Sequence, residues 1–269
     1  MRISHAIFTG FSAIAAVSTI GLGAGRPAKP SALLTRDEPA RIEVRRPRED
    51  LILTRDQGGP WIVARQPDLA DSEAVELLLS SLRTIEFGPA LGPADSAPAS
   101  GLGPADSIRL RVLDSANKEL FDGYFGRRVF SHSAYFRVGE QDAVRWASGL
   151  DPELLRRPSA QWREARVLPG GCQSGLELFA RGAWRRVADD AARELCALRA
   201  SRWAADTSED LIGFERPMFK ARTSDGRSFT VGERRGAERL VRVDGRAALL
   251  RIPAQIIEAA AADLIGSKP

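Results

Sequence analysis

Residues Leu51 to Val63 read Leu-Ile-Leu-Thr-Arg-Asp-Gln-Gly-Gly-Pro-Trp-Ile-Val, and this stretch decides the fold class. Short apolar runs at its two ends flank a Gly-Gly pair, which predicts an antiparallel hairpin. The chain repeats this order between Leu176 and Val187, where a turn at Gly182 comes just before Trp184. We therefore predict two hairpins of the same layout, in which Trp184 corresponds to Trp61.

An amphipathic helix is expected after each hairpin, because apolar residues recur there at the spacing that places them on one helix face. Asp71 stands at the amino-cap position of the first helix. Leu78 of the first helix is expected to correspond to Leu195 of the second. The apolar face consists of Val75, Leu78, Leu79, Leu82 and Ile85 in the first copy, and of Ala191, Leu195, Leu198 and Trp203 in the second.

Two further hairpins and a short closing helix complete each copy, with Val138 corresponding to Val243. The fold class predicted is α+β, with two tandem repeats, each an antiparallel sheet of hairpins covered by one amphipathic helix. The Pro-, Gly-, Ala- and Ser-rich stretch 88–106 is expected to be a loop of the first copy alone. The predicted strands are 108–112, 120–126, 135–138 and 144–146 in the first copy, and 219–223, 229–232, 240–243 and 249–252 in the second; the closing helices are 152–155 and 254–265.

The amino terminus predicts export. The run from Ala6 to Gly25 contains no charged residue, Arg2 precedes it, and Arg26 and Lys29 follow it. This order is typical of a secretory signal peptide, while the uncharged length also approaches that of a membrane anchor. Both alternatives stay open. The domain organisation expected is a signal peptide or membrane anchor at 1–25, a linker at 26–40, repeat unit one at 41–157 and repeat unit two at 158–269.

Composition and histidine content argue against several function classes. The chain has 269 residues, of which 43% are hydrophobic and 28% charged, a composition ordinary for a folded protein. Its net charge is +4, but acidic and basic residues alternate, so no concentrated basic face for nucleic acid is expected. Only His5 and His132 are present, too few for a multi-histidine metal site. We expect no enzyme activity, no cofactor, no metal and no nucleic-acid partner.

Cys172 and Cys196 are the only cysteines. In an exported chain they could form a disulfide that closes a loop of about 25 residues, worth roughly 3 to 4 kcal/mol in the chain-entropy model. The alternative is two separate buried thiols, and the sequence does not decide between them.

The segment from Arg127 to Tyr135 is the candidate contact surface, and we expect it to be a loop. Arginine and aromatic side chains, which are enriched at protein interfaces, occur together in it. Its candidate contact residues are Arg127, Arg128, Phe130, His132 and Tyr135.

Six short motifs are similar to those of a bacterial family called domain of unknown function 4340, over about residues 41–264. They are Gly58-Gly59-Pro60-Trp61-Ile62-Val63, Asp71-Ser72-Glu73-Ala74-Val75-Glu76-Leu77-Leu78-Leu79, Gly101-Leu102-Gly103-Pro104, Phe125-Gly126, Tyr135-Phe136-Arg137-Val138 and Gln161-Trp162-Arg163-Glu164. The resemblance implies a membrane-anchored extracytoplasmic protein, often encoded beside ABC-type transport systems of the gliding-motility kind. It implies no catalytic residues.

We therefore expect a non-catalytic accessory or scaffold protein of the bacterial envelope, in the periplasm or tethered to the inner membrane by its N-terminal segment. Its expected partners are envelope or membrane proteins, including ABC-type transporter components if the resemblance holds. The alternative is an extracytoplasmic ligand-binding protein, for example one that binds a glycan. A deep pocket between the copies lined by tryptophans would favour the alternative, whereas a flat, apolar-rimmed surface would favour the scaffold.

Overall fold

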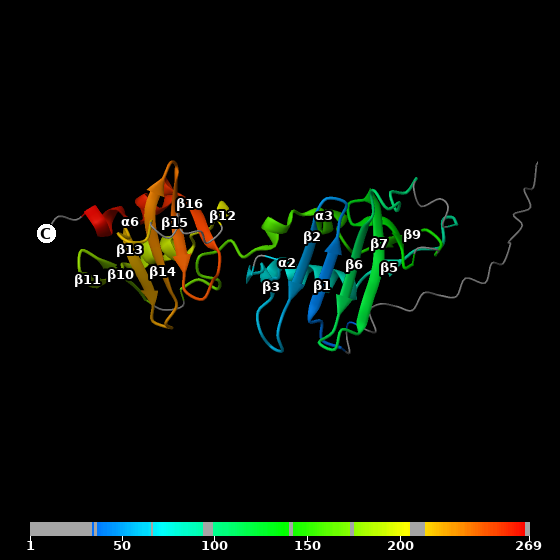
Figure 1. Cartoon of the computed structure of the whole chain (residues 1–269), viewed down its shortest axis with the longest axis horizontal. Helices are drawn as coiled ribbons and strands as arrows, with labels where there is room; N and C mark the ends of the chain where they lie inside the picture. The colour runs from blue at the N-terminus through cyan, green and yellow to red at the C-terminus, as the bar shows by residue number, and fades with distance from the viewer. Residues whose placement is uncertain are drawn as a thin grey trace, which may run out of the picture.

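The computed structural model describes residues 34, 37–65, 67–93, 99–139, 142–172, 175–204 and 213–266. The fold is α+β, as predicted, and it contains two antiparallel sheets with few helices (Figure 1). The predicted export segment at 1–25 and the first part of the expected linker lie outside the described residues. Among the described residues, none of the helices combines the length and apolar character needed to span a bilayer.

The first sheet has the strand order β4-β3-β2-β1-β6-β7-β8-β9-β5. Helix α2 (Ser72–Arg83) lies between β4 and β5 in the chain, and α3 (Pro152–Arg156) follows β9. The strands are β1 (Arg41–Arg45), β2 (Asp50–Thr54), β3 (Ile62–Val63), β4 (Asp68–Leu69), β5 (Glu86–Phe87), β6 (Ile108–Leu113), β7 (Glu119–Phe130), β8 (Ser133–Arg137) and β9 (Arg145–Ser148).

The second sheet has the strand order β11-β10-β13-β14-β15-β16-β12. Helix α4 (Asp189–Cys196) lies between β11 and β12 in the chain, and α6 (Ala254–Gly266) follows β16. The strands are β10 (Leu176–Ala180), β11 (Ala183–Arg186), β12 (Arg202–Ala204), β13 (Phe219–Thr223), β14 (Ser228–Arg235), β15 (Glu238–Val243) and β16 (Leu249–Pro253).

The seven strands of the second sheet have the same order as the last seven strands of the first sheet, β2-β1-β6-β7-β8-β9-β5. In this comparison β10 and β11 correspond to β1 and β2, β12 corresponds to β5, and β13 to β16 correspond to β6 to β9. The predicted equivalence of Trp61 and Trp184 is wrong. Trp184 lies on β11, which takes the position of β2, and its pairing with Phe179 corresponds to that of Asp50 with Arg45. The alignment failed because β1 was not predicted, so the hairpin of β2 and β3 was matched with that of β10 and β11.

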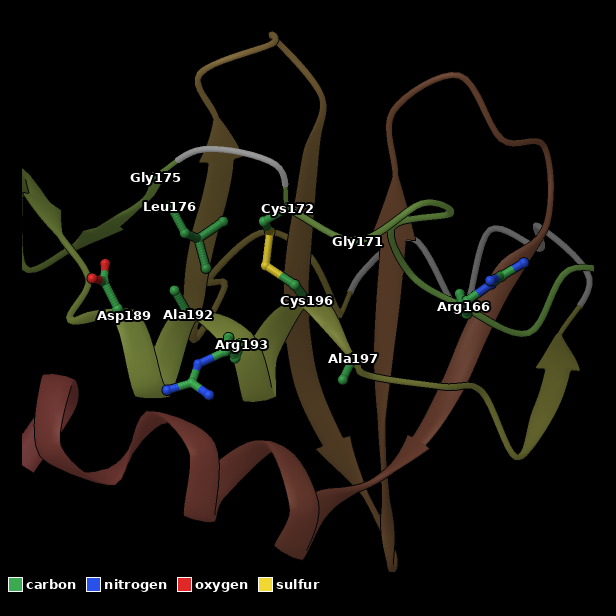
Figure 2. Close-up of a pocket in the computed structure, with 10 residues that line it drawn as sticks. All are labelled: Arg166, Gly171, Cys172, Gly175, Leu176, Asp189, Ala192, Arg193, Cys196 and Ala197. Carbon is green, nitrogen blue, oxygen red and sulfur yellow. A yellow bond between two sulfur atoms is a disulfide. The ribbon is translucent and has the colours of Figure 1, made fainter.

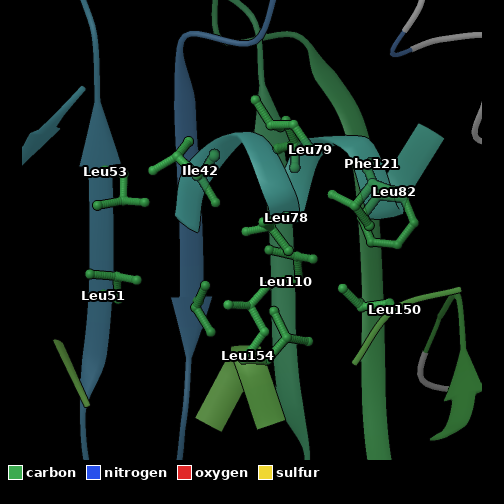
Figure 3. Close-up of a cluster of buried hydrophobic side chains, with 14 of the residues drawn as sticks. Ile42, Leu51, Leu53, Leu78, Leu79, Leu82, Leu110, Phe121, Leu150 and Leu154 are labelled. Atoms are coloured by element: carbon green, nitrogen blue, oxygen red, sulfur yellow. The ribbon is translucent and has the colours of Figure 1, made fainter. Parts of the chain in front are cut away.

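Helix α2 covers one face of the first sheet and forms its core (Figure 3). The side chain of Asp71 accepts hydrogen bonds from the N–H groups of Glu73 and Ala74, which confirms the predicted amino cap. Leu78 and Leu82 are fully buried and point toward strand residues such as Leu110. Because the helix presents one apolar stripe and the sheet one apolar face, each provides the burial that the other needs.

Helices α4 and α6 contribute to the core of the second sheet. Leu195 is buried as predicted, but Trp203 does not belong to this helix. Helix α4 ends at Cys196, and Trp203 lies on β12, where it pairs with Leu250 of β16. The closing helices α3 and α6 occur where the sequence predicted them.

Candidate contact surfaces and the junction between the units

The predicted contact segment is a hairpin and not a loop. Arg127, Arg128 and Phe130 belong to β7, and Tyr135 belongs to β8. The segment forms strands because Arg128 pairs with Ala134 and Phe130 pairs with Ser133 across the two strands. Phe130 is 73% exposed at the tip of this hairpin, whereas Tyr135 packs against the small cluster of Leu102 and Val144. Four of the five predicted residues, Arg127, Arg128, Phe130 and His132, are thus exposed, and Tyr135 is half-buried.

A buried ion pair joins the two halves of the chain. Asp68 on β4 is fully buried, and Arg246, in the turn between β15 and β16, is 2% exposed at its side chain. The guanidinium of Arg246 donates to both carboxylate oxygens of Asp68 at 2.9 and 2.8 Å. Two further N–H groups donate to the backbone carbonyls of Arg166 and Glu164 at 2.9 and 2.7 Å. Each of the three nitrogens of this guanidinium therefore donates at the contact.

We call the parts of the chain that contain the first and the second sheet the first and the second unit. The linker between them, residues 163–167, is hydrogen-bonded to both. On the side of the first unit, the N–H of Glu164 donates to the carbonyl of Leu69 at 2.8 Å. On the side of the second unit, the N–H of Val167 donates to the carbonyl of Leu198 at 2.9 Å. We call this linker together with the Asp68–Arg246 pair the junction.

Buried Glu164 and half-buried Arg166 add a second charge pair to the junction. The guanidinium of Arg166 donates to both carboxylate oxygens of Glu164, at 3.0 and 2.9 Å, and also reaches Glu73 of α2 at 2.8 Å. Burial alone would raise the pKa of the Glu164 carboxyl, but hydrogen bonds from the side chain and backbone of Arg166 lower this pKa below its ordinary value. Glu164 is therefore ionised at neutral pH.

A cleft of about 740 Å³ lies at the junction, between β2 of the first unit and β12 of the second. Its walls carry Trp203 as well as both acidic and basic side chains, including Asp50, Arg65 and Arg202. The indole N–H of Trp203 is buried and has no hydrogen-bond partner among the described residues. Trp61 and Trp162 belong to the first core, so the cleft has one tryptophan and not several.

Cys172 and Cys196 are joined by a disulfide in the second unit, with their Cα atoms 5.7 Å apart (Figure 2). The bond ties the end of α4 to the segment that precedes β10. A hollow of about 430 Å³ lies beside it, with Arg166 and Arg193 in its wall. Both arginines are already paired, with Glu164 and Asp190 respectively, so the hollow offers little uncompensated charge.

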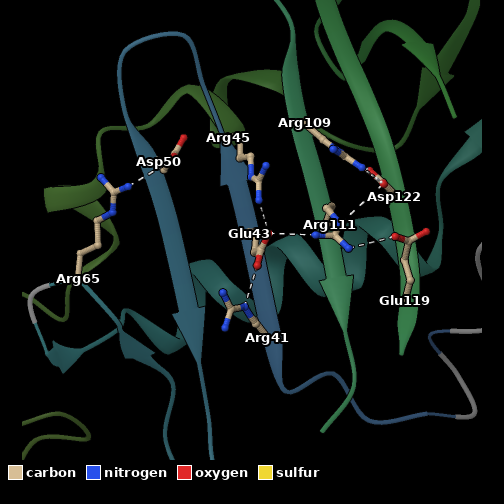
Figure 4. A network of polar contacts seen from close by, with 9 residues as sticks. All are labelled: Arg41, Glu43, Arg45, Asp50, Arg65, Arg109, Arg111, Glu119 and Asp122. Atoms are coloured by element: carbon tan, nitrogen blue, oxygen red, sulfur yellow. Dashed lines mark hydrogen bonds and ion pairs between the residues drawn. The ribbon is translucent and has the colours of Figure 1, made fainter. Parts of the chain in front are cut away.

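The open face of the first sheet is covered by a network of ion pairs (Figure 4). Glu43 of β1 contacts Arg41, Arg45 and Arg111, and its side chain is 8% exposed. Arg109 in turn pairs with Asp122 across β6 and β7 through two hydrogen bonds. Opposite charges on neighbouring strands thus compensate one another, as the alternating charges of the sequence predict for a solvated surface.

The second sheet differs at its β11 edge, which is an exposed strand with an aromatic cluster among the described residues. All four residues of β11 are exposed, and Trp184 is 38% exposed. The ring of Trp184 packs against Phe179, with centroids 5.4 Å apart, and the guanidinium of Arg222 lies over it at 4.1 Å. No sequence motif indicated this cluster; the one signal was a tryptophan placed just after a hairpin turn.

Few side chains in the described part of the chain are arranged for chemistry. No group of three or more histidine, cysteine, aspartate or glutamate residues there could hold a metal ion. His132 is exposed in the turn between β7 and β8, and its backbone carbonyl accepts from the N–H of Gly149 at 3.0 Å. The conspicuous features are therefore two: the junction and the edge at β11.

Comparison with known proteins adds no identity. No family model matches the chain, and no curated protein or solved structure matches it either. The resemblance to domain of unknown function 4340 therefore stays a prediction.

Proposed function

We propose that this protein is a non-catalytic scaffold of the bacterial envelope that binds another protein through the open edge of β11. The exposed edge with Trp184 is the observation that carries the proposal. Trp and Arg are the residue types most enriched at binding hot spots, and Trp184 and Arg222 lie in contact here. The non-catalytic part of the proposal rests on the sequence, which lacks the histidines and phosphate-binding loop that common catalytic sites use.

The other sheet edges are less suited to binding a partner. The carbonyl of Leu69 on β4 already accepts a hydrogen bond from the linker. Strands β5 and β12 have two and three residues, against four in β11. An exposed edge strand presents unpaired N–H and C=O groups to which another chain can bind.

Site-specific photo-crosslinking in cells tests this proposal. A photoreactive amino acid at Ala183 should give one discrete crosslinked envelope protein, and the same residue at exposed Asp190 should not. The crosslink should disappear when Trp184→Ala is added. Equal crosslinking from both positions, or none from Ala183, would refute the contact surface.

We propose an extracytoplasmic location, supported by the uncharged run from Ala6 to Gly25 and by the disulfide, since disulfides persist in oxidising compartments. A reporter that is active only after export, fused after Pro269, should be active. Activity of a reporter that works only in the cytosol would contradict this location.

We also propose that the two units are tandem copies of one ancestral unit, divided as 41–157 and 158–269. The shared strand order supports this, and so does a local detail. In each unit a glycine next to an irregularity in the fourth strand of the shared run, β7 or β14, packs against a loop carbonyl: Gly126 against Ser100, and Gly232 against Gly213. The next residue then donates its N–H to that same carbonyl, at 2.8 Å in the first unit and 2.9 Å in the second.

A cross-strand ion pair also recurs at the same register, as Glu43 with Arg111 and as Glu177 with Arg222. Arg137 and Arg242, the residues before Val138 and Val243, pair with Tyr124 and Thr230 at the same place in the two sheets, which supports the proposed equivalence of the two valines. The connection from β5 to β6, residues 88–107, is longer than that from β12 to β13, residues 205–218. An experimental structure in which the two sheets differ in strand order would contradict the duplication.

Binding of a small polar ligand such as a glycan in the junction cleft is a second candidate function. It is favoured by Trp203, whose indole N–H is buried without a partner among the described residues, beside paired charges that suit hydroxyl groups. Trp203→Phe removes this donor while it keeps an aromatic ring. In a glycan array, binding by the unaltered chain that is lost in Trp203→Phe would support this function.

A further inference from the structure

We infer that the partner bound at β11 is an extended acidic segment that adds to the second sheet as an antiparallel strand, in the position that β3 occupies in the first sheet. This inference rests on the proposed function and names the chemistry of the partner. It follows from three observations: the direction of the backbone groups of β11, the strand that covers the corresponding edge in the first unit, and the charge of the edge.

The turn before β11 determines which backbone groups face outward. Arg181 and Gly182 both have positive φ angles, 53° and 85°, and they form a two-residue turn between Ala180 and Ala183. Residues that flank such a turn exchange hydrogen bonds with each other, and the next pair along the ladder does not. The N–H and C=O groups of Trp184 and Arg186 therefore point away from β10, toward the open side.

The first unit shows how such an edge is completed. Strand β2, which corresponds to β11, pairs on its outer side with β3, antiparallel, with Leu53 opposite Val63. The N–H of Ala64 also donates to the carbonyl of Ile52 at 2.9 Å. By sheet register Ile52 corresponds to Arg186, so the outward carbonyl that is satisfied within the first unit has no partner among the described residues in the second. In the second sheet β11 is the last strand.

The charge of the β11 edge indicates the chemistry of the partner that would bind there. The stretch from Leu178 to Ala188 contains three arginines and no acidic residue. Arg185 and Arg186 are exposed and make no ion pair or hydrogen bond with the described residues. A second copy of this chain would bring the same arginines together. Like charges that face each other across two strands are unfavourable, so a second copy is a poor partner for this edge. Glutamate or aspartate opposite Arg186, and an apolar residue near Trp184, would instead complement the edge.

The test uses the purified chain and two acetylated octapeptides, one alternating glutamate with valine and one alternating lysine with valine. Amide and indole NMR shifts of Ala183, Trp184 and Arg186 should move on titration with the glutamate peptide and stay unchanged with the lysine peptide. Arg186→Glu should weaken binding of the glutamate peptide by up to about fivefold, the effect expected from one exposed charge pair. Lys220→Glu is the matched control. Lys220 lies on the same face of the sheet, on β13, which pairs with β10 on the side away from β11, so this variant should have a smaller effect.

A pair of variants separates backbone pairing from charge. Arg186→Ala and Arg186→Pro remove the same charge, but only proline removes the outward N–H, and β10 does not use that N–H. Arg186→Pro should therefore bind the glutamate peptide more weakly than Arg186→Ala. Circular dichroism of both variants should be unchanged if β11 is intact.

Several outcomes would overturn the inference. Equal binding of both peptides would reject the acidic partner, and equal binding by Arg186→Ala and Arg186→Pro would reject strand addition. Self-association of the chain through β11 would assign the edge to a second copy. A crosslink at Ala183 in cells without any peptide effect would reject this partner chemistry and leave the proposed function intact.

Discussion

Removing the guanidinium of Arg246 should destabilise the protein strongly, because the side chain is buried at the junction. In Arg246→Ala the Asp68 carboxylate, fully buried, would keep one hydrogen bond, from the N–H of Leu69 at 2.9 Å. The carbonyls of Glu164 and Arg166 would also lose a donor. Breaking a buried pair by removing one partner typically costs about 3 to 5 kcal/mol, because the other charge is left uncompensated. We expect a loss of that size in the free energy of unfolding.

Urea unfolding followed by tryptophan fluorescence measures this loss. Arg193→Ala is the matched control, because its pair with Asp190 is 79% and 89% exposed at the two side chains. Exposed pairs contribute about 0 to 1 kcal/mol, so this control should remain close to the unaltered chain. Arg246→Lys keeps the charge and loses the fork that contacts both oxygens, so it should fall between the two.

A double variant tests the cause. Asp68→Leu combined with Arg246→Met removes both charges, so its stability should be closer to that of the unaltered chain than that of either single variant. Small-angle X-ray scattering should show a larger radius of gyration for Arg246→Ala, since this pair joins the units. A loss below about 1 kcal/mol in Arg246→Ala, equal to that in the exposed control, would refute the reasoning.

Three further predictions concern the cores and the linker. Leu78→Ala should lower the free energy of unfolding by about 2 to 5 kcal/mol in urea titration, because Leu78 is fully buried under α2, while exposed Leu77→Ala should change it little. Replacing Cys172 and Cys196 together by alanine should cost about 3.5 kcal/mol, measured as a lower midpoint in urea, since the bond closes a loop with a sequence separation of 24. Arg166 lowers the pKa of Glu164 in the folded state. The ionised Glu164 therefore stabilises the fold fully above its ordinary pKa of about 4.5, and this stabilisation is lost as the pH falls through the lower pKa of the folded state. Glu164→Gln should therefore be less stable than the unaltered chain at pH 7, and the difference should shrink below about pH 4.5 in urea titrations at both pH values.

The long strands and the helices could be predicted from sequence because each carries its own periodic signal. Strand β6 alternates buried and partly exposed residues from Ile108 to Val112, and α2 has both a cap and an apolar stripe. Strand β1 carries a weaker signal, because its apolar residues Ile42 and Val44 stand among Arg41, Glu43 and Arg45, and Glu43 is buried as well. Only the neighbouring strands, which pair these charges, show that the segment is a strand. Strands of two residues, such as β4, carry no periodic signal at all.

The junction and the edge could not be predicted, because both depend on which segments meet in space. Asp68 and Arg246 are 178 residues apart, and neither belongs to a motif. The sequence predicts that Trp184 corresponds to Trp61, because each follows a hairpin turn. The two differ because Trp61 is covered by its own unit and 4% exposed, whereas β11 is the last strand of its sheet. Whether an edge strand is open depends on whether another segment pairs with it, and the residues of the strand itself do not indicate this.

The difference between the two edges also indicates how the protein could be organised for binding. In the first unit β3 and β4 extend the sheet beyond β2, and β4 carries Asp68, which holds the second unit through Arg246. In the second unit the same side of the sheet stops at β11. At the corresponding register the first unit has the charged pair Arg45 and Asp50, and the second has the aromatic pair Phe179 and Trp184. If both units descend from one ancestor, this side of the sheet fixes the second unit in the first copy, and in the second copy it is the side at which we propose that a partner strand binds.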